Sequence, residues 1–357
     1  MKVVLFIYDL TGGGAERVTV NLANYLIKRK YDVTILTVVE DEVAYEIDEK
    51  IKVRSLSKKE EFRGTVFNHM MWYSRLLRFD RCEQAECYVS MLLIPTKIIM
   101  LARRFIKGKV IFSERNDPAS YPLKTQRWLK RLTKNADGYV FQVPGAAKWY
   151  EDTVKNKKWE IIPNAVNQDF MNIKTENRQR KQAIVAVGRL ESQKNHKLLI
   201  NAFARLPKEY EDYQLKIYGQ GSLEAELRTQ ISELGMDHKV FLMGYCRNVG
   251  EKIKNAAIYV MSSDYEGMPN SLIEAMVLGL PCIATDCPCG GSAWLIQDGI
   301  NGILVPARDE KALRDAVIRI LSDIGVAEKM GSEAKKIAIS LNPDFIYKKW
   351  QAFIERV

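Results

Sequence analysis

Short apolar runs that read as β-strands alternate with amphipathic helical patterns along almost the whole chain. Residues 32–39, for example, form the run DVTILTVV, which has the length and composition of a strand buried on both faces. Repeated strand–helix units predict parallel sheets covered by helices, which is the α/β class. The strands are expected at 2–8, 32–39, 86–91, 109–114 and 137–142, and again at 183–190, 213–219, 239–244, 256–263 and 281–286.

This pattern stops and restarts near IIPNAVNQD (161–169). The polar stretch TENRQRKQ (175–182) follows, and it is either a linker or an exposed approach to the next strand. A chain of 357 residues is long enough for two domains of ordinary size. We therefore expect two Rossmann-like domains, the first over residues 1–163 and the second over 164–338. Ligands of open α/β sheets bind outside the carboxyl ends of the strands, so two domains that face each other would enclose a central cleft.

The composition argues against several classes of protein. An apolar fraction of 47% and a charged fraction of 27% are typical of a soluble globular chain. The most apolar stretch, residues 88–104, is broken by Pro95 and Lys97 and is too short to span a membrane. Residues 1–14 read as a first strand and not as a signal peptide. Six cysteines in a chain of this size form no disulfide framework and match no usual zinc spacing, so we expect a cytoplasmic protein.

Positive charge is concentrated in the first half of the chain. Residues 1–165 carry 29 Lys and Arg against 20 Asp and Glu, which accounts for +9 of the net charge of +10. Three segments, 58–81, 97–109 and 124–134, hold much of this charge, and in the last the cations recur at helical spacing. Such stretches suit an anionic membrane surface, but ordinary surface helices have the same pattern. No nucleic-acid-binding module accompanies the charge, so nucleic acid is not an expected partner.

The segment EGMPNSLIE (266–274) places two glutamates around a predicted helix start. Pro269 suits the first helical position because its missing N–H would be unpaired there. Glu266 then precedes the helix, and Glu274 lies past its first turn among apolar neighbours, where a carboxylate needs a partner. A helix N-terminus attracts phosphate, and carboxylates accept hydrogen bonds from sugar hydroxyls. The segment suits a sugar nucleotide; the alternative is that the acidic residues only favour the helix dipole.

A glycine loop, DLTGGGAER (9–17), follows the first predicted strand. Gly12, Gly13 and Gly14 permit close approach of a ligand to the backbone, or they simply turn the chain into the next helix. The loop lacks the later glycine of the dinucleotide fingerprint and the Lys-Ser/Thr ending of a P-loop. By itself it therefore does not identify a ligand.

Two more motifs follow predicted strands in the second half. VGRLESQKN (187–195) places Arg189 and Lys194 where cations can neutralise a diphosphate, although solvated surface cations would look the same. In the next, IYGQGSLEAEL, Gly219 and Gly221 mark a strand end that turns sharply or that a bulky group approaches.

Taken in order, the segments GGGAER, VGRLESQK, IYGQGSLEAEL, VFLMG and EGMPNSLIEAMVLGLPCIATD resemble glycosyltransferase family four, whose members are retaining enzymes of the GT-B fold. The resemblance covers nearly the whole chain and is most specific in the second half. It implies a GT-B architecture of two Rossmann-like domains facing a cleft. It also implies a C-terminal helix, within 339–357, that crosses back to the first domain.

The resemblance implies roles for the motif residues. Glu266 would contact the donor sugar and Glu274 the ribose, while Arg189 and Lys194 would bind the diphosphate. The segment from Val240 to Cys246 would flank the base. The remaining donor-binding residues would be Gly13, Gly14, Gly219, Gly267, Met268, Pro269, Asn270, Ser271 and Leu272.

The sequence departs from the family at one position. Many relatives carry a histidine in a first-domain loop that reaches the donor sugar, whereas here the corresponding residues read SERNDP (113–118), as in a subset of bacterial capsule and exopolysaccharide transferases. Arg115 is expected to take over part of the role of that histidine, with Glu114 and Asn116 as alternatives. The competing interpretation is that the residues from Asn116 to Pro118 only build a turn.

The implied activity is retaining transfer of a hexose or N-acetylhexosamine from a nucleotide sugar, by default a UDP-sugar, to a glycan. The chain has no D-x-D triplet, so no metal cofactor is expected and Arg189 and Lys194 would replace the cation. The basic, aromatic first half favours a lipid-linked acceptor, for example one on polyprenyl diphosphate, at the inner face of the cell membrane. The resemblance of SERNDP implies bacterial surface polysaccharide synthesis. A non-catalytic nucleotide-sugar-binding protein and a nucleotide-dependent epimerase or oxidoreductase are the competing interpretations.

Overall fold

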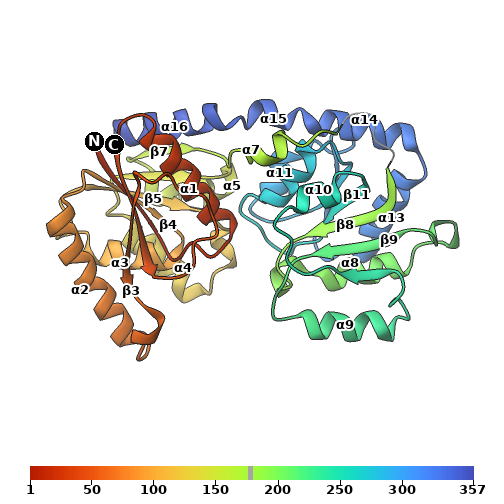
Figure 1. Ribbon diagram of the computed structural model, residues 1–357, viewed down its shortest axis with the longest axis horizontal. Coiled ribbons are helices and arrows are strands. Elements are labelled where there is room, and N and C mark those ends of the chain that lie inside the picture. The colour runs from red at the N-terminus through yellow and green to blue at the C-terminus, as the bar shows by residue number, and fades with distance from the viewer. Residues whose placement is uncertain (176–179) are drawn as a thin grey trace. The chain divides into compact units, whose positions relative to one another are not determined.

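The computed structural model describes residues 1–175 and 180–357, which form two compact units (Figure 1). The first unit comprises Met1–Ala165 and Asp344–Val357, and the second comprises Val166–Pro343. Each unit contains one sheet whose paired strands are all parallel, which confirms the expected α/β class. Part of the expected linker, residues 176–179, lies outside the described residues.

The first unit has a seven-stranded sheet in the order β3-β2-β1-β4-β5-β6-β7. Its central strands are buried on both faces, because α1 and the other helices cover them. Val18, Leu22 and Leu26 form the buried side of α1, as their helical spacing predicts. The elements are β1 (Lys2–Ile7), α1 (Gly14–Ile27), β2 (Asp32–Val39), β3 (Lys52–Ser57), η1 (Lys59–Glu61), α2 (Thr65–Glu83), β4 (Cys87–Met91), α3 (Leu93–Ala102), β5 (Lys109–Glu114), η2 (Pro118–Ser120), α4 (Leu123–Thr133), β6 (Gly138–Phe141), α5 (Pro144–Trp149), α6 (Glu151–Val154), β7 (Lys158–Ile161) and α16 (Pro343–Arg356).

The second unit has a six-stranded sheet in the order β10-β9-β8-β11-β12-β13. One face packs against α8, α9 and α13 through a continuous apolar core that includes Ile184, Ile217 and Phe203. The elements are α7 (Gln168–Met171), β8 (Lys181–Val187), η3 (Ser192–Lys194), α8 (His196–Ala204), η4 (Lys208–Tyr210), β9 (Gln214–Tyr218), α9 (Glu224–Glu233), β10 (Val240–Leu242), α10 (Val249–Ile253), β11 (Ala256–Met261), α11 (Asn270–Val277), β12 (Cys282–Asp286), α12 (Gly291–Leu295), β13 (Ile303–Pro306), α13 (Glu310–Leu321), α14 (Ile324–Lys335) and α15 (Ile337–Ser340).

The C-terminal helix α16 belongs to the first unit apart from its first residue. Its side chains Trp350 and Phe353 are fully buried there. Arg356 at its end pairs with Glu160 of β7 at 3.0 Å. Among the described residues, no helix is long and apolar enough to cross a membrane.

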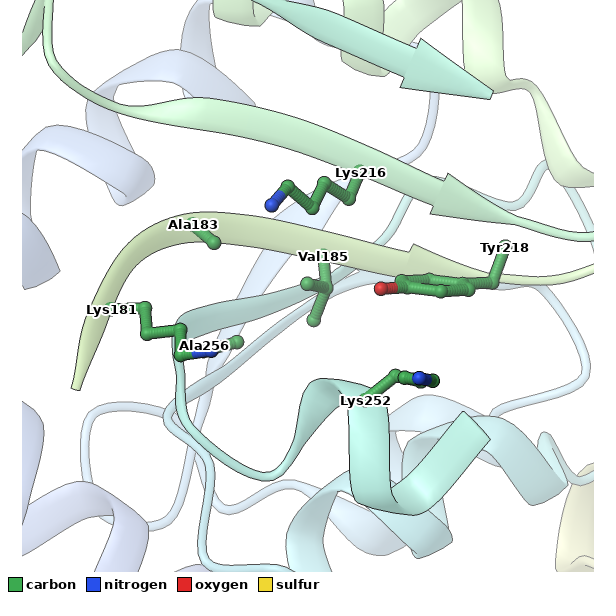
Figure 2. Close-up of a pocket in the computed structure, with 7 residues that line it drawn as sticks. All are labelled: Lys181, Ala183, Val185, Lys216, Tyr218, Lys252 and Ala256. Atoms are coloured by element: carbon green, nitrogen blue, oxygen red, sulfur yellow. The ribbon is translucent and has the colours of Figure 1, made fainter. Parts of the chain in front are cut away.

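The other face of the second sheet is covered by α11 and α12 over β11 and β12. Over β8 and β9 it is bordered by α10, which has only five residues, and a cavity of about 190 Å³ remains (Figure 2). We call this cavity the lysine hollow. It is lined by Lys181, Ala183, Val185, Lys216, Tyr218, Lys252 and Ala256.

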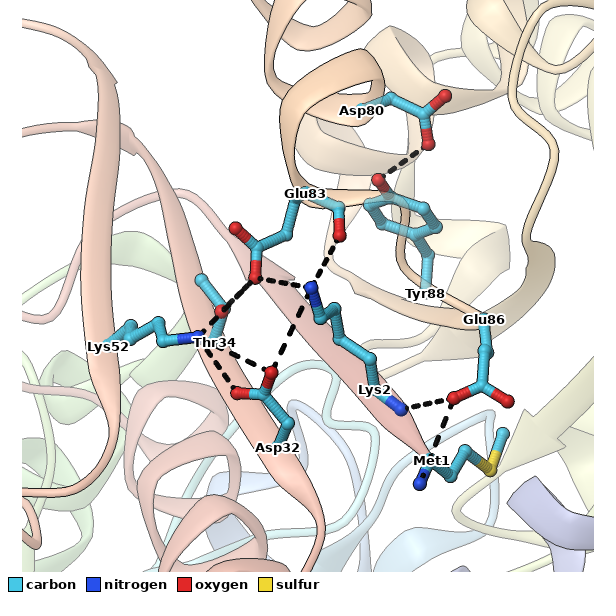
Figure 3. Close-up of polar contacts among 9 residues, drawn as sticks. All are labelled: Met1, Lys2, Asp32, Thr34, Lys52, Asp80, Glu83, Glu86 and Tyr88. Carbon is cyan, nitrogen blue, oxygen red and sulfur yellow. Dashed lines mark hydrogen bonds and ion pairs between the residues drawn. The ribbon is translucent and has the colours of Figure 1, made fainter.

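A network of polar contacts joins the amino ends of the first strands of the first sheet to the end of α2 (Figure 3). Lys2 donates to the backbone carbonyl of Glu83 at 2.7 Å, and Lys52 pairs with Asp32 at 3.0 Å. Deeper in the same region, the hydroxyl of Tyr88 donates to Asp80 Oδ1 at 2.8 Å, and both residues are buried. Charged side chains therefore cover the amino ends of these strands, at the edge of the sheet opposite the carboxyl ends.

We expect Tyr88→Phe to lower the free energy of unfolding by about 1–3 kcal/mol, because it leaves a buried carboxylate without this donor. Tyr139→Phe is the matched control, since Tyr139 is equally buried but its hydroxyl donates to the backbone carbonyl of Thr133. Urea unfolding of the two variants should show the smaller loss for Tyr139→Phe. An equal or larger loss for the control would contradict this assignment.

Candidate active site

An ion pair between a half-buried lysine and a buried glutamate joins the loops that follow β8 and β11 in the second unit. Lys194 Nζ lies 2.5 Å from Glu266 Oε1, and the two side chains are 16% and 9% exposed. Ser263 Oγ donates to the same carboxylate oxygen at 2.8 Å. Of the predicted site residues, the structure therefore brings Lys194 and Glu266 together at the carboxyl edge of the sheet. Ligands bind at this edge in open α/β sheets.

Several further hydrogen bonds tie the same two loops together. Gln193 Nε2 donates to the carbonyl of Tyr265 at 2.9 Å, and Asn195 Nδ2 donates to Asp264 Oδ1 at 2.8 Å. Asn195 has a left-handed backbone, with φ +42°, and its side-chain oxygen caps α8 at Leu198 N. Asparagine tolerates this conformation better than most residues. The loop that carries Lys194 is thus held in one geometry from both sides.

Arg189 lies on the same loop, but its side chain is exposed. Among the described residues it enters no ion pair, in contrast to Lys194. An exposed guanidinium beside a half-buried ammonium can accept a phosphate from solvent without first breaking an internal contact. Of the two predicted diphosphate-binding residues, Lys194 is therefore already paired with a carboxylate, whereas Arg189 is exposed to solvent and can bind a ligand directly.

The predicted helix start is present one residue later than expected. Pro269 is the N-cap of α11 and not its first helical residue, because its ψ of 107° is extended. Residues Gly267, Met268, Pro269 and Leu272 are buried, Asn270 and Ser271 are half-buried, and Ser271 Oγ forms a 2.9 Å hydrogen bond with buried Tyr259. Glu274 is 7% exposed within α11. Gly267 is packed closely, since a Cβ on Gly291 would lie 1.8 Å from the Gly267 carbonyl oxygen.

Gly219 follows β9 and lies against the loop of Arg189. Its φ is +151°, and a Cβ there would lie 1.9 Å from the Gly188 carbonyl oxygen. Its N–H donates to the carbonyl of Gly244 at 2.9 Å. The glycine is therefore required by a close approach of protein backbone, whatever else it contacts. Beyond Gly244, Tyr245 is 70% exposed in the segment predicted to flank a base.

His196 is a buried residue beside Lys194 that the sequence did not single out. Burial, together with the charge of Lys194, lowers the pKa of its ring to about 4. The imidazole is therefore neutral at neutral pH and adds no charge to the region. Its position at the first residue of α8 makes it part of the support for the Lys194 loop.

In the first unit, the glycine loop is held by a tyrosine. Tyr45 Oη accepts from the N–H of Gly13 at 2.6 Å and donates to its carbonyl oxygen at 2.7 Å. Gly13 caps α1, Gly14 is its first residue, and both are exposed. The loop is thus pre-formed at the carboxyl end of β1. Sequence reasoning missed Tyr45 because it lies 32 residues away in a segment without regular structure.

Glu114, at the end of β5, is the centre of a buried polar cluster. Its carboxylate accepts from the hydroxyls of Tyr150 at 2.9 Å and Tyr121 at 3.3 Å, and from the N–H groups of Arg115 and Asn116 at 3.1 and 3.2 Å. Burial raises the pKa of this carboxyl to about 7, against the opposing effect of these donors. Asp117 next to it caps the turn at Ala119 N, so part of SERNDP does build a turn.

Arg115 is 8% exposed and points to a different set of partners. It donates to Asn164 Oδ1, which also accepts from Gln142 Nε2 at 2.8 Å. Burial lowers the pKa of the guanidinium to about 10, so it stays charged at neutral pH. Its Nε and Nη1 form no hydrogen bond among the described residues. Glu114 and Arg115 are neighbours in sequence with separate environments.

We expect Lys194→Ala to lower the free energy of unfolding by about 3 kcal/mol, because it leaves Glu266 buried without its cation. The double variant Lys194→Ala/Glu266→Ala should recover part of this loss. Arg189→Ala, which removes an exposed cation from the same loop, should change stability by less than about 0.5 kcal/mol. Glu266→Ala alone completes the double-mutant cycle, so denaturant unfolding of the wild type, the two single variants and the double variant gives the coupling energy; additive losses would contradict a coupled pair.

Comparison with known proteins assigns both halves of the chain to one kind of enzyme. The family described as "Glycosyl transferases group 1" matches residues 167–337, and "Glycosyltransferase Family 4" matches residues 12–170. A Campylobacter jejuni protein named as an undecaprenol-linked-glycan α-1,4-N-acetyl-D-galactosaminyltransferase is 28% identical over 100% of this chain and 99% of its own. The amylovoran biosynthesis glycosyltransferase AmsD of Erwinia amylovora is 24% identical over 95% of each chain.

Solved structures agree on the fold. Sucrose-phosphate synthase from Thermosynechococcus elongatus matches with a TM-score of 0.84 and 18% identity, over 99% of this chain and 98% of that one. HepE from Anabaena, solved with UDP, matches with a TM-score of 0.82 and 15% identity over the full length of both chains. With the two parallel sheets and the family matches, these similarities confirm the predicted architecture. The chain belongs to the family-four, group 1 glycosyltransferases of the GT-B fold, and it is a glycosyltransferase.

Proposed function

We propose that this enzyme transfers a hexose or N-acetylhexosamine from a UDP-sugar to a lipid-linked glycan, with retention at the anomeric carbon and without a metal. The observation that carries the donor assignment is the engaged Lys194–Glu266 pair beside the exposed cation Arg189, at the carboxyl edge of the second sheet. These groups supply carboxylate for sugar hydroxyls and cations for a diphosphate. Two Campylobacter relatives are named as transferases of undecaprenol-diphosphate-linked glycans, which supports a lipid-linked acceptor.

In the proposed reaction, the bond between the anomeric carbon and the diphosphate oxygen breaks. A bond from an acceptor hydroxyl oxygen forms on the same face of the sugar, and the hydroxyl proton passes to the departing diphosphate. Lys194 has three N–H donors, so it can keep Glu266 in place while it also binds a phosphate oxygen. Arg189 would neutralise the growing charge on the leaving group, the part that a metal plays in other transferases. Gly267 to Leu272 and Glu274 would bind the rest of the donor.

Roles for the first unit remain part of this proposal. Gly13 and Gly14 would approach the donor through the loop that Tyr45 holds. Arg115 would act in place of the family histidine, which requires its side chain to exchange at least part of its contact with Asn164 for the ligand. Its unpaired Nε and Nη1 make such an exchange less costly, because the guanidinium is incompletely satisfied where it lies.

We expect UDP to raise the thermal midpoint of the purified enzyme in the presence of a chelator, because a ligand of the native state stabilises it by mass action. GDP, ADP and NAD should raise it less. Arg189→Ala should weaken UDP binding by about tenfold, the loss of one good charge-assisted contact. Arg319→Ala, which removes an exposed cation from α13, is the matched control and should leave UDP binding unchanged.

The purified enzyme and one variant also test sugar transfer. Glu266→Gln should keep UDP binding within a few fold and should abolish sugar transfer to a polyprenyl-diphosphate-linked glycan. The product of the wild-type enzyme, read by NMR, should retain the anomeric configuration of the donor. Normal turnover of Glu266→Gln, or inversion of configuration, would refute the mechanism. Stabilisation by UDP only after a divalent metal is added would refute metal independence.

The proposal includes peripheral membrane contact, and the surface of α2, α3 and α4, which pack side by side in the first unit, supports it. Exposed cations on α4 and its C-cap are Lys124, Arg127, Arg131 and Lys134. Apolar side chains on α2, on α4 and just after α3 are also exposed, with Met70 at 68%, Phe105 at 64% and Leu123 at 69%. Exposed cations and exposed apolar groups on neighbouring helices suit an anionic lipid surface, which supports action at the cytoplasmic face of the cell membrane.

We expect Arg127→Ala/Arg131→Ala to bind phosphatidylglycerol vesicles roughly 30-fold more weakly, at about 1 kcal/mol for each cation removed. Lys311→Ala/Lys329→Ala removes the same charge from exposed positions on the second unit and should bind as the wild type does. Sedimentation with vesicles measures both. Equal loss in the two double variants would show that only net charge matters.

A further inference from the structure

The lysine hollow lies on a part of the second unit that the proposed reaction does not use. Its floor is Ala183 and Val185 of β8, and Lys216 and Tyr218 extend toward it from β9, while Lys252 approaches from α10 (Figure 2). The hollow runs along the strands, so Lys181 lies six residues before the end of β8, roughly 20 Å from that end, whereas Val185 and Tyr218 lie close to the strand ends. No lining residue is shared with the Lys194–Glu266 site.

The charge in the hollow is of one sign. Three ammonium groups border it, and none of its described lining residues is acidic. None of the three lysines forms an ion pair among the described residues, whereas Lys254, two positions from Lys252, pairs with Glu251 at 2.7 Å. Like charges around a partly enclosed space repel one another, and an anion between them removes that cost.

The chemistry of the lining limits the kind of anion. Lysine ammonium groups bind phosphate as point charges, and the hydroxyl of Tyr218, a buried residue of the lining, can add a hydrogen bond. The cavity of about 190 Å³ is smaller than the roughly 300–1,000 Å³ of pockets that hold drug-sized ligands. A nucleotide would therefore not be enclosed, whereas a diphosphate or a sugar phosphate would.

We propose that the lysine hollow is a second anion-binding site, which holds a small polyvalent phosphate such as free diphosphate or a sugar phosphate, separate from the donor site. The short crossover helix α10 creates the site by leaving β8 and β9 partly uncovered. Val187 ends β8 and Gly219 follows β9, and both lead into the loops of the donor site. An anion in the hollow would therefore lie against the strands that carry these loops.

Calorimetry with inorganic diphosphate on the full chain tests the proposal in an Arg189→Ala background, which weakens the donor site. This protein should still bind diphosphate, and adding Lys216→Ala/Lys252→Ala should weaken that binding by about tenfold or more. Adding Lys311→Ala/Lys329→Ala instead should leave it unchanged. Both lysine pairs are exposed or half-buried and form no ion pair with any residue that the structure describes, so thermal midpoints should stay close to that of the background.

Three outcomes would overturn the proposal. Loss of all diphosphate binding in Arg189→Ala alone would assign the anion to the donor site. Equal affinities in the hollow variant and its control would remove the lysines from the site. Unchanged diphosphate affinity with weaker binding to phosphatidylglycerol vesicles would assign Lys216 and Lys252 to a lipid surface. Failure of UDP binding in the wild type would refute the proposed donor without affecting any of these comparisons.

Discussion

Parallel pairing of every strand in both sheets decides where the rest of the molecule can lie. A parallel strand must be joined to the next one by a crossover, so each strand is followed by a helix or a long loop, and the strands are buried on two faces. All strands of one sheet then end at the same edge. In the first unit the opposite edge is closed by the contacts of Lys2, Asp32 and Lys52, which leaves the carboxyl edge for the glycine loop and Glu114.

At the carboxyl edge of the second sheet, the ion pair of Lys194 and Glu266 is largely removed from solvent. Removing two ions from water costs several kcal/mol for each, and the attraction between them offsets this only when further hydrogen bonds complete the geometry. Ser263 supplies one such bond to Glu266, and the carbonyl of Lys194 accepts another from Ser262. The pair therefore contributes more to the geometry of two loops than to net stability. A donor site needs this geometry, because cations and carboxylate must be in place before the ligand arrives.

The central strands could be predicted because their own sequences carry the signal. The run at 32–39 and the run at 109–114 appear with the predicted bounds as β2 and β5. The strands that were missed, β3, β7 and β13, all lie at sheet edges, where one side has no partner and the apolar pattern is short or interrupted. A continuous apolar run reports burial on both faces, so this signal weakens at edge strands, where burial is less complete.

Parts of the candidate site followed from motif order, but the contacts that hold it did not. Lys194 and Glu266 lie 72 residues apart, and only their shared family pattern suggested that they meet. Tyr45 beside Gly13 and Tyr150 beside Glu114 have no local signal at all, because each contact depends on how separate segments pack. The burial of Arg115 was likewise not predictable from the sequence. Its place in SERNDP suggested a group that takes over part of the role of the family histidine, and no local signal indicated that its guanidinium is buried against Asn164.

Burial of Glu114 links proton uptake to folding of the first unit. Its ordinary pKa of 4.5 rises to about 7 in the folded chain, so between these values the folded protein holds a proton that the unfolded chain has released. The stability that this group contributes is fully present below the lower value and is lost as the pH rises through the upper one. Near neutrality the cluster of Glu114, Tyr121 and Tyr150 therefore exists in two charge states, and small changes in acidity shift the balance between them.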